Sequence, residues 1–189
     1  QGALDRYAMA RAVLSRSPLD RSQAWAVRRF RGLLDERVGA IHRSLGDPEA
    51  ALEPFRASLA QRVQLASEDP NHLDALRDVA IGHQLLCQVE AELGRPDRGI
   101  PDCEAALERF RELRELDLDN RAAAVDLAIM QGAAAQVQAQ AGDRAATRSL
   151  VGEAIRTREA ILAGDPGNTV NPRVLAELRT WLAALAAEG

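Results

Sequence analysis

The sequence repeats itself with a period of 48 residues. Three glycines and three aspartates each recur at this spacing, so two independent markers share one period: Gly46, Gly94 and Gly142, and Asp69, Asp117 and Asp165. A fixed period of this size is typical of proteins in which one supersecondary unit stacks on the next. The period constrains the fold more strongly than any other feature of the chain.

Each unit has the pattern of two antiparallel helices. The chain is 47% hydrophobic but only 3% aromatic, a composition that suits close-packed helices better than a sheet. Apolar residues also recur in columns 48 residues apart, which chance would rarely produce. These columns are Val38, Leu86, Ala134 and Leu182; Ile41, Val89, Val137 and Leu185; and Phe55, Cys103 and Val151.

Local signals place the turn within the first unit. We expect Gly46 to end one helix, Asp47 to be the N-cap of the next and Pro48 to take its first position. Pro54 and Pro101 conflict with this pattern, because an interior proline removes a hydrogen bond and kinks a helix. We therefore expect the helices around these two prolines to bend or to start late.

The pattern predicts one all-α domain over residues 1–189, with about three repeats and a half-repeat at each end. Asn171 and Pro172 have the pattern of an N-cap and a first helical position for the last helix. The predicted parts are an orphan second helix at 3–16, repeat 1 at 22–67, repeat 2 at 71–116, repeat 3 at 120–163 and a capping helix at 172–187.

The units resemble tetratricopeptide repeats (TPR) in an elongated form. Small residues and an aromatic stand at family positions: Gly39, Gly46, Ala51, Phe55 and Ser58-Leu59 in repeat 1; Cys87, Gly94, Gly99, Cys103 and Ala106-Leu107 in repeat 2; Ala135, Gly142, Thr147, Val151 and Ala154-Ile155 in repeat 3. The resemblance implies a right-handed superhelical solenoid of helix pairs. The period departs from the 34 residues of that family, and the aromatic position is occupied by Cys103 and Val151 in repeats 2 and 3.

The family resemblance implies a protein–protein interaction scaffold that binds a peptide or partner domain in its concave groove. The groove positions carried over are Glu36, Arg43, Gln84, Gln88, Gln136 and Gln140, together with apolar and small neighbours such as Ile129 and Gly132. Glutamine both donates and accepts hydrogen bonds, which suits recognition of a peptide backbone. The alternative is that this polar face is only solvated. Only Arg43 fits the clamp that some family members use for acidic C-terminal tails.

Two other functional hypotheses remain open. Elongated repeats of this kind are similar to those in large bacterial proteins that carry Ser/Thr kinase, protease or ATPase modules, so the chain could be a regulatory or spacer segment of a signalling enzyme. The absence of an initiator Met and the Gln1-Gly2 start suit a fragment of something longer. Self-association through an apolar stripe of Leu4, Tyr7 and Leu14 on the N-terminal helix is the other possibility.

Charge and hydropathy limit the partners. A net charge of −4 and a pI near 5.5 argue against nucleic-acid binding. Residues 1–45 are nonetheless basic, which would steer an acidic partner to this end or form a solvated face. The chain has no apolar run of 18 residues and no signal-peptide pattern, so we expect no membrane partner and favour a cytoplasmic location.

No residue pattern points to catalysis, a metal or a cofactor. The sequence has no P-loop, G-x-S-x-G or H-E-x-x-H motif, so we expect a non-enzyme. His83 and Cys87 are four residues apart, and Cys103 could lie opposite them, but we interpret both cysteines as buried free thiols in a reducing cytosol. The paired columns leave a disulfide conceivable in an oxidising setting.

Overall fold

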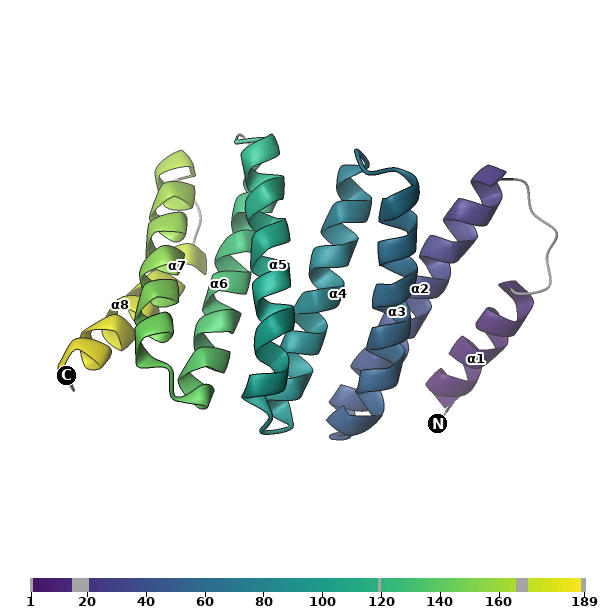
Figure 1. Cartoon of the computed structure of the whole chain (residues 1–189), viewed down its shortest axis with the longest axis horizontal. Helices are drawn as coiled ribbons and strands as arrows, with labels where there is room; N and C mark the ends of the chain where they lie inside the picture. Colours follow the sequence, from purple (N-terminus) through teal and green to yellow (C-terminus); the bar gives the residue numbers. More distant parts are fainter. Residues whose placement is uncertain (1, 15–20, 119, 166–169, 188–189) are drawn as a thin grey trace.

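The computed structural model describes residues 2–14, 21–118, 120–165 and 170–187. These ranges contain eight helices and no strand (Figure 1). The helices are α1 (Gly2–Leu14), α2 (Arg21–Ser44), α3 (Pro48–Glu68), α4 (Leu73–Glu92), α5 (Pro96–Leu116), α6 (Arg121–Ala141), α7 (Arg144–Gly164) and α8 (Val170–Ala187).

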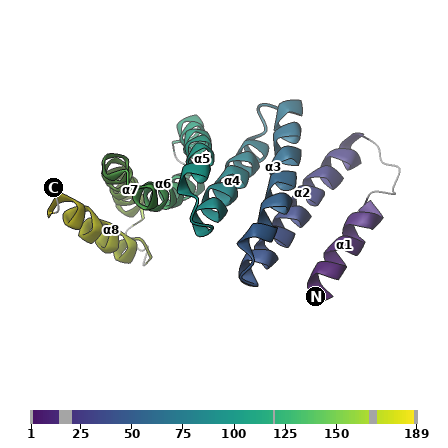
Figure 2. The same cartoon turned by 60° about the horizontal axis from the view of Figure 1, so that its bottom comes forward.

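Each helix packs against the next, and the row curves (Figures 1 and 2). Repeat 1 consists of α2 and α3, repeat 2 of α4 and α5, and repeat 3 of α6 and α7, with α1 and α8 at the two ends. The expectation of an all-α helical-repeat solenoid is confirmed. The expected end of the first helix at residue 16 lies outside the described residues.

Left-handed glycines make the turns within the repeats. The φ angles of Gly46, Gly94 and Gly142 are 78°, 69° and 82°, a conformation that residues with a β-carbon rarely adopt. Asp47 then caps α3, because its side chain accepts a hydrogen bond from the backbone N–H of Ala50. The predicted glycine stop and Asp47 cap are both confirmed.

Of the two expectations at the interior prolines, a bend or a late start, the late start is wrong and the bend stays a prediction. Helices α3 and α5 begin at Pro48 and Pro96, and each continues through its second proline, Pro54 or Pro101. An interior proline removes only one helical hydrogen bond. Packing against the flanking helices on both sides holds the remaining backbone of α3 and α5 in place.

The predicted cap of the last helix is also wrong. Helix α8 begins at Val170, so Asn171 lies inside the helix and not at its N-cap. The Asn171 side chain is buried and its Oδ1 accepts a hydrogen bond from Nη1 of Arg158 at 2.9 Å. A contact with the preceding helix, which has no local sequence signal, therefore explains this asparagine.

Facing columns of the two helices in each repeat complement one another in size. In repeat 1, a β-carbon added to Gly39 would come within 2.5 Å of the Phe55 ring. The equivalent positions in repeat 3 are Ala135 and Val151, both fully buried. A very small residue thus faces a large one in repeat 1, and two intermediate residues face each other in repeat 3. This lets ridges enter grooves at a similar interhelical separation.

In repeat 2 the same two columns hold a disulfide bond between Cys87 and Cys103, with a Cα–Cα distance of 5.0 Å. The interpretation of these residues as free thiols is therefore wrong, although their burial is confirmed. The close approach of the two columns brings the sulfur atoms together. Because disulfides persist in oxidising compartments, the argument for a cytoplasmic location from reduced cysteines no longer holds.

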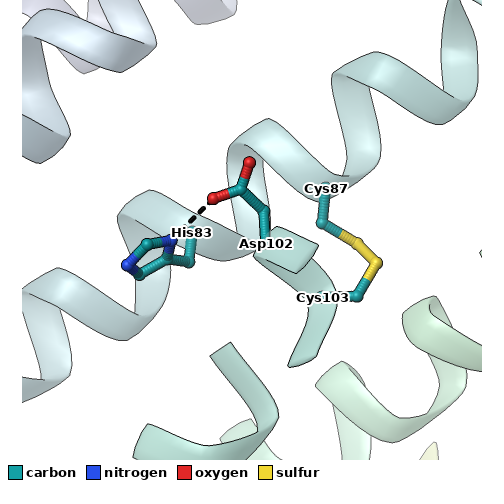
Figure 3. The surroundings of a disulfide bond; sticks show 4 residues. All are labelled: His83, Cys87, Asp102 and Cys103. Carbon is teal, nitrogen blue, oxygen red and sulfur yellow. Dashed lines mark hydrogen bonds and ion pairs between the residues drawn. A yellow bond between two sulfur atoms is a disulfide. The ribbon is translucent and has the colours of Figure 1, made fainter. Parts of the chain in front are cut away.

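A second link joins the same two helices beside the disulfide. Nδ1 of His83 on α4 lies 2.7 Å from Oδ1 of Asp102 on α5 (Figure 3). Both cysteine sulfurs are used by the disulfide, so neither is available as a thiolate nucleophile or metal ligand. Across the described ranges, no three His, Cys, Asp or Glu side chains form a group that could hold a metal ion.

Ion pairs connect the first helices of successive repeats. Arg29 of α2 binds Asp78 of α4, and the equivalent Arg77 of α4 binds Asp126 of α6. These contacts repeat with the 48-residue period. Among the residues that the structure describes, no helix has the length and hydrophobicity needed to cross a membrane.

Candidate functional site

The helices α2, α4, α6 and α8 form one face of the stack, which we call the first-helix face. Helices α4 and α6 are not consecutive in the chain but pack against each other. The first helices of repeats 2 and 3 therefore approach each other on this face. All six groove residues carried over from the sequence belong to these helices.

Two of the six residues take part in ion pairs within the protein. Glu36 binds Arg62, a side chain of α3 that is only 4% exposed and also donates to the carbonyl of Asp78 at 2.8 Å. Arg43 binds Glu92 of the next repeat with two hydrogen bonds, one of them 3.0 Å long. Both side chains therefore hold the stack together, and a ligand would have to break these pairs to bind them.

The four glutamines separate into two groups. Gln84 is half-buried on α4, and Gln140 is exposed near the end of α6. Gln88 and Gln136, which are equivalent positions one repeat apart, line the same hollow. The sequence predicted all four glutamines for the groove, and the structure brings these two together.

The hollow has a volume of about 360 Å³ and is lined by residues of α4, α6, α7 and α8. Its wall combines apolar side chains with a few polar groups, as ligand pockets commonly do. The lining residues are Gln88, Ile129, Gly132, Ala133, Gln136, Arg158, Val174, Glu177, Leu178 and Trp181. We call it the Arg158 hollow, after its one arginine.

Arg158 was not among the predicted groove residues, because it comes from α7, a second helix. Its Nη1 donates to Asn171, whereas its Nε is buried and has no hydrogen-bond partner among the described residues. Burial removes water from the guanidinium and lowers the pKa of Arg158. No carboxylate of the described residues pairs with it, so the hollow contains a half-buried, uncompensated positive charge.

The residues equivalent to Arg158 in the other repeats provide a sequence signal for its burial. The equivalent residues are Arg62 in repeat 1 and Phe110 in repeat 2, and both are buried. An arginine in a buried column needs a partner. The sequence does not show where its guanidinium group points, because that depends on the distant helix α8.

Two of the hollows that are larger than this one have simpler structural explanations. One, between α7 and α8, contains arginines whose side chains hold the end of α8. Arg144 and Arg148 donate to the carbonyl of Leu185 at 3.1 and 2.6 Å. The other, about 540 Å³, is the seam between α1 and α2.

That seam corrects the picture of an exposed stripe on the N-terminal helix. Leu4 and Tyr7 are half-buried and face Leu34 across the seam. The large apolar side chains of α1 that are described as exposed are Met9 and Val13, with exposed fractions of 71% and 66%. The side chain of Leu14 lies outside the described set. Leu4 and Tyr7 thus pack α1 onto α2.

Comparisons with known proteins give no functional assignment. No family model matches the chain, and a search of curated proteins also finds no match. Among solved structures, the chain is similar to the de novo designed helical repeat protein DHR64, with a TM-score of 0.40 and 16% identity over 95% of this chain and 88% of that one. It is also similar to the "DHF58 filament", with a TM-score of 0.41 and 15% identity over 88% of this chain and 84% of that one.

Proposed function

We propose that the chain is a non-catalytic binding module of TPR-like architecture, which holds an extended peptide of a partner protein on its first-helix face. The Arg158 hollow supports this proposal most directly. It places two equivalent glutamines, Gln88 and Gln136, beside the apolar side chains of Ile129 and Trp181. Apolar walls supply affinity, and a few polar groups fix the orientation of a ligand.

The spacing of the glutamines favours an extended segment as the ligand. Equivalent positions on adjacent first helices present the same amide group twice along one face. An extended backbone offers N–H and C=O groups at regular intervals, and a glutamine side chain satisfies either kind. One such hydrogen bond stabilises binding by about 0.5–1.5 kcal/mol, so the apolar contacts would provide most of the affinity.

The test is selection of binders from phage-displayed random dodecapeptides. We expect the wild type to enrich peptides whose affinity falls about tenfold for Gln88→Ala/Gln136→Ala. The matched control is Gln84→Ala/Gln140→Ala, which makes the same change on the same two helices outside the hollow and should bind like the wild type. Equal losses in both double variants, or no enriched peptide at all, would reject the proposal.

A further inference from the structure

The interior arginines of repeats 1 and 3 occupy equivalent positions but have different partners. Arg62 in repeat 1 is almost fully buried and forms an ion pair with Glu36. Arg158 stands 96 residues later, two periods on, in repeat 3. The position equivalent to Glu36 in that repeat is Gly132. Repeat 3 therefore retains the arginine and lacks the carboxylate.

The space beside Gly132 is open. Apart from the adjacent residues and the backbone of α6, no described atom lies within 4 Å of a β-carbon added to Gly132. Gly132 and Arg158 both line the hollow. In repeat 1, the backbone carbonyl of Asp78 accepts a hydrogen bond from Arg62. The residue equivalent to Asp78 two periods later is Val174, and it lines the same hollow. The hollow thus occupies the place that the Glu36 side chain fills in repeat 1.

Arg158 has the capacity to bind an anion there. Among the described residues, its buried Nε has no partner, and its guanidinium makes one hydrogen bond, with the neutral Asn171. A guanidinium can bind both oxygens of a carboxylate, and such a pair is stronger when it is shielded from water. Glu177 is the only acid among the described residues of the wall, and it is 64% exposed and pairs with Arg173 at 3.8 Å.

We infer that Arg158 binds an aspartate or glutamate side chain of the partner peptide, in the place that Glu36 occupies beside Arg62. This inference rests on the proposed function and specifies its ligand: an acidic residue flanked by aliphatic ones, which pack against Ile129, Val174 and Trp181. Because Gln88 and Gln136 are one repeat apart along the face, the peptide runs through the hollow and does not end in it. The carboxylate therefore belongs to a side chain and not to a C-terminus.

The phage-displayed dodecapeptides test this directly, because their C-termini are joined to the coat protein and carry no free carboxylate. The wild type should enrich peptides with an acidic residue next to an aliphatic one. An amidated synthetic copy of an enriched peptide should then bind about tenfold more tightly than its Glu→Gln or Asp→Asn analogue. The free-acid form of that neutral analogue should not recover the affinity.

Two protein variants locate the effect. Arg158→Gln should bind the acidic peptide and its neutral analogue equally. Gly132→Glu supplies the missing carboxylate from the protein itself, so it should lose the acidic peptide, whereas the neutral control Gly132→Gln should retain most of the preference for it. Gly132→Glu leaves every other side chain of the hollow in place, so it tests the idea even if Arg158→Gln unfolds.

The outcomes separate this inference from the proposed function. If the enriched peptides need Gln88 and Gln136 for binding but contain no preferred acidic residue, the inference is overturned and the proposed peptide binding stands. An acidic preference that persists in Arg158→Gln and Gly132→Glu would also overturn it. A free-acid neutral peptide that binds as well as the acidic one would assign the site to a C-terminus instead. If no peptide is enriched, both proposals fail.

Discussion

Gly39 lies against the ring of Phe55, and a β-carbon at Gly39 would come 2.5 Å from the ring atom Cε1. The ring is 1% exposed, so other groups of the protein enclose it. Gly39→Ala should therefore destabilise the protein by about 1–3 kcal/mol through overpacking. Chemical denaturation followed by circular dichroism measures this change in the free energy of unfolding.

The size complementarity of the two columns predicts a specific rescue. Gly39→Ala/Phe55→Val reproduces the Ala135–Val151 pair of repeat 3, so it should be less destabilised than the sum of its single variants. The control is Gly152→Ala, where the nearest described atom to the new methyl group is the flexible end of Arg156 at 3.5 Å. That variant should be unchanged or more stable by up to about 1 kcal/mol. If the loss of stability in Gly39→Ala/Phe55→Val equals the sum of the losses in its two single variants, residues 39 and 55 do not complement each other in size.

The disulfide between Cys87 and Cys103 should stabilise the oxidised protein. It closes a loop with a sequence separation of 16 residues, for which the expected contribution is about 3 kcal/mol. Dithiothreitol should lower the free energy of unfolding of the wild type by this amount. It should leave Cys87→Ala/Cys103→Val, which carries the residue pair of repeat 3, unaffected. Two thiols titrated in air-oxidised, unfolded wild type would contradict the bond.

Equivalent N-cap positions should differ in their sensitivity to substitution. Oδ1 of Asp143 accepts a hydrogen bond from the N–H of Ala146 at 2.9 Å, whereas the equivalent Arg95 makes no side-chain cap hydrogen bond. Asp143→Ala should cost about 0.5–2 kcal/mol. Arg95→Ala should cost less than about 1 kcal/mol, since it removes only an exposed ion pair with Glu49. Urea unfolding of both variants tests this, and equal costs would show that the cap hydrogen bond contributes nothing.

Glu36 should support the fold through its buried partner. Glu36→Ala leaves Arg62, whose side chain is 4% exposed, without its carboxylate, and removing one member of a buried pair costs about 3–5 kcal/mol. Glu112→Ala, which breaks the exposed pair with Arg109, should cost less than about 1 kcal/mol. Thermal or urea unfolding compares the two. A loss below about 1 kcal/mol for Glu36→Ala would show that Arg62 is not held by this contact.

Short-range signals in the sequence predicted much of the fold. The left-handed glycines, the Asp47 cap and the burial of Phe55, Cys103 and Val151 each depend on residues close in the chain or on a simple period. The glycines and the buried column recur in all three repeats, and the aspartate cap recurs in repeats 1 and 3, so one unit reinforces the interpretation of the next.

Long-range contacts between helices could not be predicted in the same way. Glu36 is at a family groove position, yet its partner Arg62 lies on another helix and turns it inward. Arg158 and Asn171 meet only because α7 and α8 pack together. A disulfide between Cys87 and Cys103 requires two conditions. The sequence suggested the first, the close approach of the two columns, but it could not show the second, an oxidising environment.

The Cys87–Cys103 bond also changes how the protein would respond to force. When the chain is pulled from both ends, the segment between the two cysteines cannot extend, because the bond spans it with a Cα–Cα distance of 5.0 Å. At about 3.5 Å per extended residue, the 16-residue separation makes the oxidised chain about 50 Å shorter at full extension than the reduced chain. Repeats 1 and 3 would unravel completely, while the middle repeat keeps a closed loop that tension alone does not open.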